Sequence, residues 1–271
     1  MTRARSRSLA AVLAEGRRLR YSPLTPLFLL AGVMAPFALT AGLILIGPEH
    51  MNPPMPGIES VEGVRGLISV VVLSAPIPAI MGSLSLTSEY SHRTMVPTFL
   101  AEPRRWPVLV AKVLTISGLG VTYGAATGIG AFAGILTGAS VTAAPLALSP
   151  EALALTSARL GAGMALYAVL GAGLGALLRR QLLTAGIIFV WLYFGESLIS
   201  VLPGGAAVYP WLPGGAVSAL IGHSLMADAI GRSLGTGSIA LLSPAVAALV
   251  LMAYTGILSA IALLVPLRRE A

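Results

Sequence analysis

Long apolar segments alternate with short polar ones along this chain of 271 residues. Because an α-helix rises about 1.5 Å per residue, roughly 20 apolar residues cross the ~30 Å hydrocarbon core of a membrane. The long apolar segments predict six transmembrane helices, over residues 24–47, 65–87, 109–137, 152–178, 182–202 and 241–266. Ser149-Pro150-Glu151 has the order of a helix start, with serine as the cap and proline in the first turn.

Two flanking segments are predicted to lie at the membrane surfaces. Residues 1–23 contain apolar positions that share one helical face and arginines that reach lipid headgroups, so we expect an amphipathic interfacial helix there. A basic tail without structure remains the alternative for residues 1–7. Residues 203–240 stay apolar and include Leu202-Pro203-Gly204-Gly205 and a second Leu-Pro-Gly-Gly sequence at 212–215. These features predict short re-entrant helices between the fifth and sixth spans, interrupted by Pro-Gly turns.

Composition supports a membrane protein and excludes an ordinary soluble one. Hydrophobic residues make up 56% of the chain and charged residues 10%, with a mean hydropathy of +0.89, whereas soluble domains carry roughly 25% charge. The absence of cysteine excludes disulfides and thiol ligands. The expected fold is an all-α membrane protein, a single transmembrane domain over residues 1–271 with six helices, the interfacial helix, and extracellular re-entrant helices.

The distribution of the basic residues predicts the orientation. The net charge is +7, and fourteen basic residues flank the spans on the side of the termini, while Arg65, Arg159 and Arg232 fall to the other side. Basic residues accumulate on the cytoplasmic side of membrane proteins. Both termini are therefore expected in the cytoplasm, with the chain in the inner (plasma) membrane of a bacterium. The basic charge is explained by topology and membrane lipids, so no nucleic acid partner is expected.

Glycines recur at four-residue spacing in the third span, at Gly120, Gly124 and Gly128 and again at Gly130, Gly134 and Gly138. The fourth span is also rich in glycine. This spacing lets two helix backbones approach closely in lipid. Static packing within the chain is one interpretation, and a sliding or dimer surface is the other.

The sequence contains no HExxH or GxxxxGK motif, and no catalytic, metal or cofactor site is expected in this chain. Glu196 is the acid that follows the apolar run of the fifth span. An acid in the membrane is costly and often functional. With Tyr193 and Tyr123, Glu196 is a candidate for the transport pathway or gate. The alternative is an acid that bonds the re-entrant helices or extends toward the surface.

The connection between the second and third spans is the richest segment. It combines an acid-aromatic pair, a basic stretch and a Pro-Arg sequence before a lysine. These residues are Glu89, Tyr90, Thr94, Pro103, Arg104, Arg105 and Lys112. The segment resembles the linker between the second and third helices of ABC-2 type transporter permeases. That family often has arginine at the position of Ser91 and glycine at that of Arg93. The six spans and the segment before the sixth also look like the family.

The resemblance implies a permease subunit without its own ATPase. A second permease copy and separate cytoplasmic ABC ATPase subunits would be its partners, and the ATPases would bind ATP. Residues 88–108 would form the cytoplasmic coupling segment. Its candidate contact residues are Glu89, Tyr90, Arg93, Thr94, Phe99, Arg104 and Arg105. Family members export hydrophobic or amphiphilic compounds, including drugs, antibiotics and lipids, which suggests multidrug efflux or antibiotic resistance. An ion-coupled secondary carrier and a membrane enzyme or sensor remain alternatives, so whether the chain is part of an enzyme stays open.

Overall fold

The computed structural model of the protein describes residues 24–51, 54–91, 105–225, 227–228, 231 and 239–269. All regular elements in these ranges are helices. Six of the described helical segments are long and apolar enough to cross a membrane, as the hydropathy pattern predicts. They cover Leu24–Ile46, Val61–Thr87, Val110–Thr142, Pro150–Leu178, Gln181–Val201 and Pro244–Ile261. The predicted interfacial helix at residues 1–23 lies outside the described residues.

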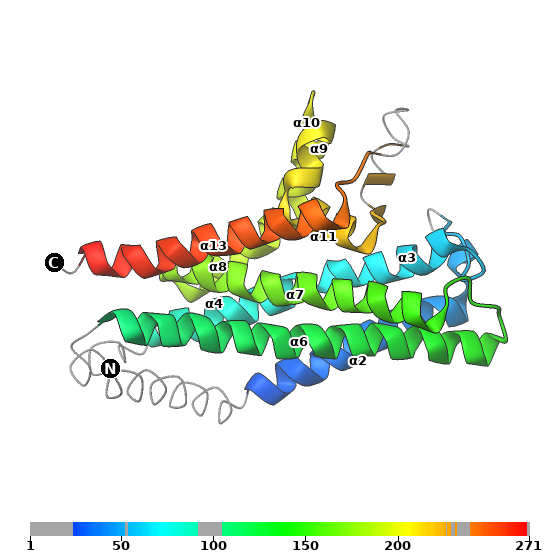
Figure 1. Ribbon diagram of the computed structural model, residues 1–271, viewed down its shortest axis with the longest axis horizontal. Helices are drawn as coiled ribbons and strands as arrows, with labels where there is room; N and C mark the ends of the chain where they lie inside the picture. The colour runs from blue at the N-terminus through cyan, green and yellow to red at the C-terminus, as the bar shows by residue number, and fades with distance from the viewer. Residues whose placement is uncertain are drawn as a thin grey trace.

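The long helices run side by side along the long axis of the molecule (Figure 1). Helix α7 (Pro150–Leu178) is central, because it contacts α6 (Arg105–Thr142), α4 (Pro76–Ser91) and α13 (Pro244–Arg269). Helix α2 (Leu24–Ile46) packs on the other side of α6. One end of the bundle holds residues 143–149 and is called the α6–α7 end below. The other holds Arg179 and Arg180 and is called the α7–α8 end.

The second span is built from three pieces and begins before the predicted residue 65. Helix α3 (Val61–Val70) is capped by Ser60, whose Oγ accepts a hydrogen bond from the Gly63 amide at 3.0 Å. A 3₁₀ turn, η2 (Val71–Ser74), then leads into α4 at Pro76. Proline lacks an amide donor and interrupts a regular helix. The serine cap and the proline thus set boundaries that hydropathy alone does not show.

The third and fourth spans form the longest pair of helices. Helix α6 exceeds the predicted range 109–137 at both ends. Helix α7 begins as predicted, because the Ser149 Oγ accepts a hydrogen bond from the Ala152 amide at 3.2 Å and Pro150 occupies the first turn. It ends at Arg179, which adopts a left-handed conformation with φ of 56°. The Ser-Pro helix start is therefore confirmed.

The glycine rows of α6 pack against two different neighbours. A Cβ on Gly124 would meet the carbonyl oxygen of Gly161 in α7, and one on Gly128 would lie 2.8 Å from the carbonyl oxygen of Ser157. A Cβ on Gly130 would instead meet the backbone of Val33 in α2. Since 124 and 128 face one helix and 130 faces the other, both rows serve close packing within the chain. The structure matches the static interpretation of the glycine spacing.

The fifth span bends where a π-turn interrupts it. Helix α8 (Gln181–Val190) leads through the π-turn η3 (Trp191–Gly195) into α9 (Glu196–Val201). Sharp bends in helices are typical of such turns. The short helices α9 and α10 (Gly205–Val208) project away from the long axis of the bundle (Figure 1). Between α9 and α10, Gly204 has a φ of 80°, a conformation that favours glycine.

The chain then returns to the bundle. A 3₁₀ turn, η4 (Tyr209–Trp211), precedes α11 (Pro213–Ile221), which packs against α13 and α7. Val217 and Ile221 of α11 are completely buried. Short helices separated by Pro-Gly turns are thus confirmed in the described part of 203–240, while their position relative to a membrane stays a prediction. The last helix, α13, begins at Pro244 rather than 241, with the Ser243 Oγ near the Val246 amide at 3.4 Å.

Candidate functional site

A cavity of about 370 Å³ lies where the bent fifth span meets α7, α11 and the second span around η2. Most of its wall is apolar, but it also contains three tyrosines, an acid and several serines. The polar lining residues are Ser69, Tyr167, Tyr193, Glu196, Ser197, Tyr209, Ser218 and Ser224. Ligand sites in proteins are typically apolar cavities of about 300–1,000 Å³ with a few polar groups. This cavity therefore has the size and chemistry of a small-molecule site.

Glu196 lies in the cavity wall and is almost fully buried, with 4% of its surface exposed. Its two carboxylate oxygens accept hydrogen bonds from the Gly214 amide at 3.0 and 2.8 Å. Gly214 is in the first turn of α11, where amides have no partner within the helix. A negative charge there is also favoured by the helix dipole. Glu196 thus joins α9 to α11, which matches the interpretation of an acid that bonds the re-entrant helices.

Tyr193 shares this cavity with Glu196, as expected for neighbours in one span. It belongs to the π-turn, and its hydroxyl donates a hydrogen bond to the Leu73 carbonyl oxygen at 2.5 Å. Leu73 belongs to the 3₁₀ turn η2. The irregular turns of the second and fifth spans therefore meet at the cavity. A role of Glu196 and Tyr193 in transport remains a prediction.

Tyr123, the third candidate for the pathway, lies elsewhere. Its side chain is buried, with 1% exposed, and its ring faces Gly32 of α2, where an added Cβ would be 3.0 Å from the Tyr123 Cε2. It does not line the cavity that contains Glu196 and Tyr193. The structure thus brings two of the three candidates together and assigns Tyr123 to the packing between α2 and α6.

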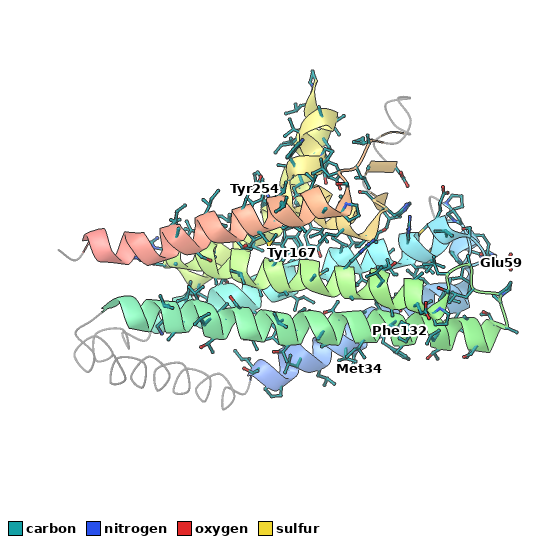
Figure 2. All side chains as sticks on the ribbon, in the orientation of Figure 1. Met34, Glu59, Phe132, Tyr167 and Tyr254 are labelled. Carbon is teal, nitrogen blue, oxygen red and sulfur yellow. The ribbon has the colours of Figure 1, made fainter. Side chains whose placement is uncertain are left out.

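Two tyrosines of the cavity were not singled out as candidates from the sequence. Tyr167 lies in the middle of α7 (Figure 2), with 2% of its surface exposed. Tyr209 shares a hydrogen bond with Ser224 at 2.9 Å, and burial raises the pKa of its phenol. Tyr167 and Leu192 also line a second cavity of about 410 Å³, which includes Tyr254 and Leu258 of α13 and has no charged residue. Tyr167 therefore stands between a polar and an apolar cavity.

The structure describes only some of the candidate coupling residues. Glu89 and Tyr90 fall in the last turn of α4, and Arg105 is the first residue of α6. Arg93, Thr94, Phe99 and Arg104 lie outside the described residues, as do residues 92–104 as a whole. The two helices that flank the segment are both present, so the segment connects α4 to α6. Its contacts with a partner remain a prediction.

Gly222, His223 and Asp228, which follow α11, form a small charged cluster with Arg65 and Glu62 of α3. The His223 Nε2 is 3.4 Å from Asp228 Oδ2, and it would lie 3.5 Å from a Cβ on Gly66 of α3. Burial lowers the pKa of His223, while Asp228 and Glu62 act in the opposite direction and Arg65 in the same one. Within the described residues, no group of three or more acids and histidines is placed to hold a metal ion.

The lowered pKa of His223 makes the stability of the folded protein depend on pH. Because the pKa of His223 is lower in the folded protein than the usual ~6.5, the unfolded chain binds more protons as the pH falls below that value. The stabilisation is present above pH ~6.5 and is lost as pH falls through the lower, folded pKa. We expect the thermal unfolding midpoint in detergent to drop less between pH 7.5 and 5.5 in His223→Gln than in the wild type. His50→Gln, at an exposed histidine, is the control, and equal pH dependence in all three proteins would contradict the assignment.

No family model matches this chain, and no curated protein is similar to it. The structure itself defines the class: a multi-pass membrane protein, with six long apolar helices in the part of the chain that the structure describes.

Proposed function

We propose that this protein is the membrane-spanning permease subunit of an ATP-driven ABC transporter that exports a hydrophobic or amphiphilic compound. The observation that carries the proposal is the segment between α4 and α6, whose acid-aromatic pair, basic stretch and Pro-Arg sequence resemble the ABC-2 permease linker. That segment connects the second and third of six apolar spans, as in the family. Because the chain has no nucleotide-binding motif, separate ATPase subunits would supply the energy.

The positions of the basic residues support a cytoplasmic location for the segment between α4 and α6. Helix α6 begins at Arg105, α7 ends beside Arg179 and Arg180, and α13 ends at Arg269, all at the α7–α8 end of the bundle (Figure 1). Basic residues accumulate on the cytoplasmic side. The segment between α4 and α6 would therefore face the cytoplasm, where an ATPase is available to bind it.

The two adjoining cavities support an amphiphilic substrate. One contains Glu196 and several hydroxyl groups, and the other is apolar, with Tyr167 and Leu192 in the walls of both. A compound with one polar and one apolar end would satisfy both environments without leaving a polar group unpaired. A movement of α4 or of the π-turn η3 would change both cavities, since Pro76 and Ala79 of α4 and Leu192 of η3 line them.

The proposal is tested by co-expressing this chain with an ABC ATPase subunit, sought first among the genes beside it. We expect the two proteins to co-purify and, in vesicles, to accumulate fluorescent amphiphiles only when ATP is added. Glu89→Lys and Phe99→Ala should each lower transport about tenfold, the effect of losing roughly 1.4 kcal/mol of docking free energy. Insertion into the membrane should be unaffected.

Glu151→Lys is the matched control, because Glu151 is exposed at the start of α7, at the opposite end of the bundle. Transport that follows an ion gradient without any ATPase would refute the proposal. Full transport by both coupling variants would refute the docking role of residues 88–108.

A further inference from the structure

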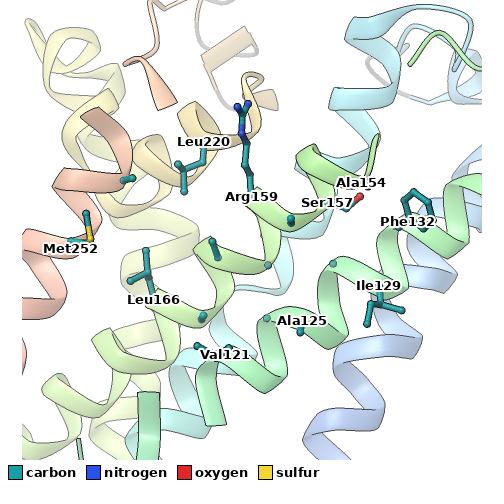
Figure 3. Close-up of a pocket in the computed structure, with 17 residues that line it drawn as sticks. Val121, Ala125, Ile129, Phe132, Ala154, Ser157, Arg159, Leu166, Leu220 and Met252 are labelled. Atoms are coloured by element: carbon teal, nitrogen blue, oxygen red, sulfur yellow. The ribbon is translucent and has the colours of Figure 1, made fainter. Parts of the chain in front are cut away.

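A groove of about 780 Å³ runs between α6, α7 and α13 (Figure 3). Its floor is made of small residues, including Gly124, Gly128 and Gly161, and its sides of larger apolar ones such as Leu166 and Met252. It opens to the surroundings, since Val121 and Ile129 on its rim are each 63% exposed. All three helices are candidate spans, so lipid is the natural medium outside the groove.

Arg159 of α7 is the one charged residue that lines this groove. Figure 3 shows its side chain extending past Leu220, away from Val121 and Ile129. Among the described residues, no hydrogen bond or ion pair holds its guanidinium. An arginine with an apolar groove beneath it has the layout of a site for an anionic amphiphile.

The position of Arg159 along α7 allows its side chain to reach the depth of lipid headgroups. The 29 residues of α7 span about 43 Å, which exceeds the ~30 Å hydrocarbon core by roughly 13 Å. If the excess is shared between the ends, the backbone of Arg159, nine residues from Pro150, lies about 7 Å inside the hydrocarbon boundary. Arginine side chains extend from such positions toward the headgroups.

Ser157 provides a second, independent sign of a missing partner. Its side chain is 2% exposed and lines the same groove, and its Oγ makes no hydrogen bond within the described residues. Buried hydroxyl groups in proteins are nearly always paired. A polar atom of an occupant, next to its charged group, would satisfy this hydroxyl.

We propose that the groove binds one anionic phospholipid, with its phosphate at Arg159 and an acyl chain along the small-residue floor. Guanidinium groups bind phosphate with two parallel hydrogen bonds. The close approach of α6 and α7 at Gly124 and Gly161 leaves a shallow apolar channel that a flexible chain can follow.

A second copy of the chain fits this groove less well. Burying Arg159 in such an interface without an acid would leave an unpaired charge, which is strongly unfavourable. No acid is among the described residues that line the groove, so a two-fold contact through this face would bring two Arg159 side chains together without a partner. A phospholipid brings its own negative charge.

The test is lipid retention by the purified full chain, measured by native mass spectrometry after equilibration with vesicles of phosphatidylglycerol or phosphatidylcholine. The wild type should retain phosphatidylglycerol about tenfold more than phosphatidylcholine, and Arg159→Gln should abolish that preference. Arg159→Lys should keep part of it. Arg180→Gln, at an exposed arginine of the other end, should retain lipid like the wild type.

A second variant fills the channel without touching the charge. Ala125→Trp, at an exposed position of the groove, should lower phosphatidylglycerol retention while its thermal unfolding midpoint stays near that of the wild type. Equal retention of both lipids by the wild type, or unchanged retention by Arg159→Gln, would overturn the proposal. If these variants instead lost a dimer and kept their lipid, a second copy of the chain would be what covers the groove. That result would also overturn the proposal.

Discussion

Gly124→Val is expected to disrupt the pairing of α6 and α7 and to be among the most damaging single substitutions in the chain. The added Cβ would meet the carbonyl oxygen of Gly161, a backbone atom that moves only if the whole helix moves. Overpacking a core costs about 1–3 kcal/mol, and occasionally more. Here the cost is at the high end, because α7 also contacts α4, α13 and α11 and cannot shift without loosening these contacts.

The measurement is the thermal unfolding midpoint in detergent together with the fraction of protein that elutes as a single species. Gly118→Val is the matched control, because it lies in the same helix and has no atom within 4 Å of an added Cβ. Both variants carry the same change in helix propensity, so the difference between them reports packing. Equal midpoints for the two variants would contradict the close approach of α6 and α7.

Hydropathy was sufficient to predict the six spans, because the bilayer requires a minimum length of apolar helix. The boundaries depended on local chemistry. The Ser149-Pro150 start was recognisable from sequence, and Pro76 indicated a kink in the second span, whereas the 3₁₀ turn η2 before it was not predicted. A chain of apolar residues hides such a division, since neither 3₁₀ nor π-turns have a strong sequence signature.

The cavity was less predictable than the spans. Glu196 stood out as a charge in an apolar context, but its partner Gly214 is 18 residues away and reaches it only because the chain turns twice, at Gly204 and at Pro213. Tyr167 gave no signal, because a single tyrosine in an apolar helix is ordinary. A search for polar residues in the same third of different spans would have found it.

Arg159 had two assignments from the sequence. It was counted among the basic residues on one side of the membrane, and the predicted span 152–178 also contained it. The structure places it inside α7, in the wall of the groove. Basic residues near the end of a long helix thus contribute to topology while they also line the lateral surface.

The second major effect is expected at the contact between Glu196 and Gly214. Glu196→Ala leaves the Gly214 amide without its acceptor, and hydrogen bonds to charged groups contribute about 1.5–3 kcal/mol. Gly214→Ala is expected to destabilise the protein as well, because its Cβ would meet the Glu196 carboxylate. Both changes should increase amide hydrogen exchange in α11 and lower the unfolding midpoint.

The double variant separates this contact from a general weakening. Once Glu196 is alanine, the space that a Cβ at Gly214 requires is free, so the second substitution should cost little. We therefore expect the two effects to be non-additive by roughly 0.5–3 kcal/mol, as for residues in direct contact. Gly186→Ala, with open space around it, should be neutral and additive with Glu196→Ala. Additive effects at 196 and 214 would show that the carboxylate does not hold α11, and the acid would then have to be explained by the cavity that it lines.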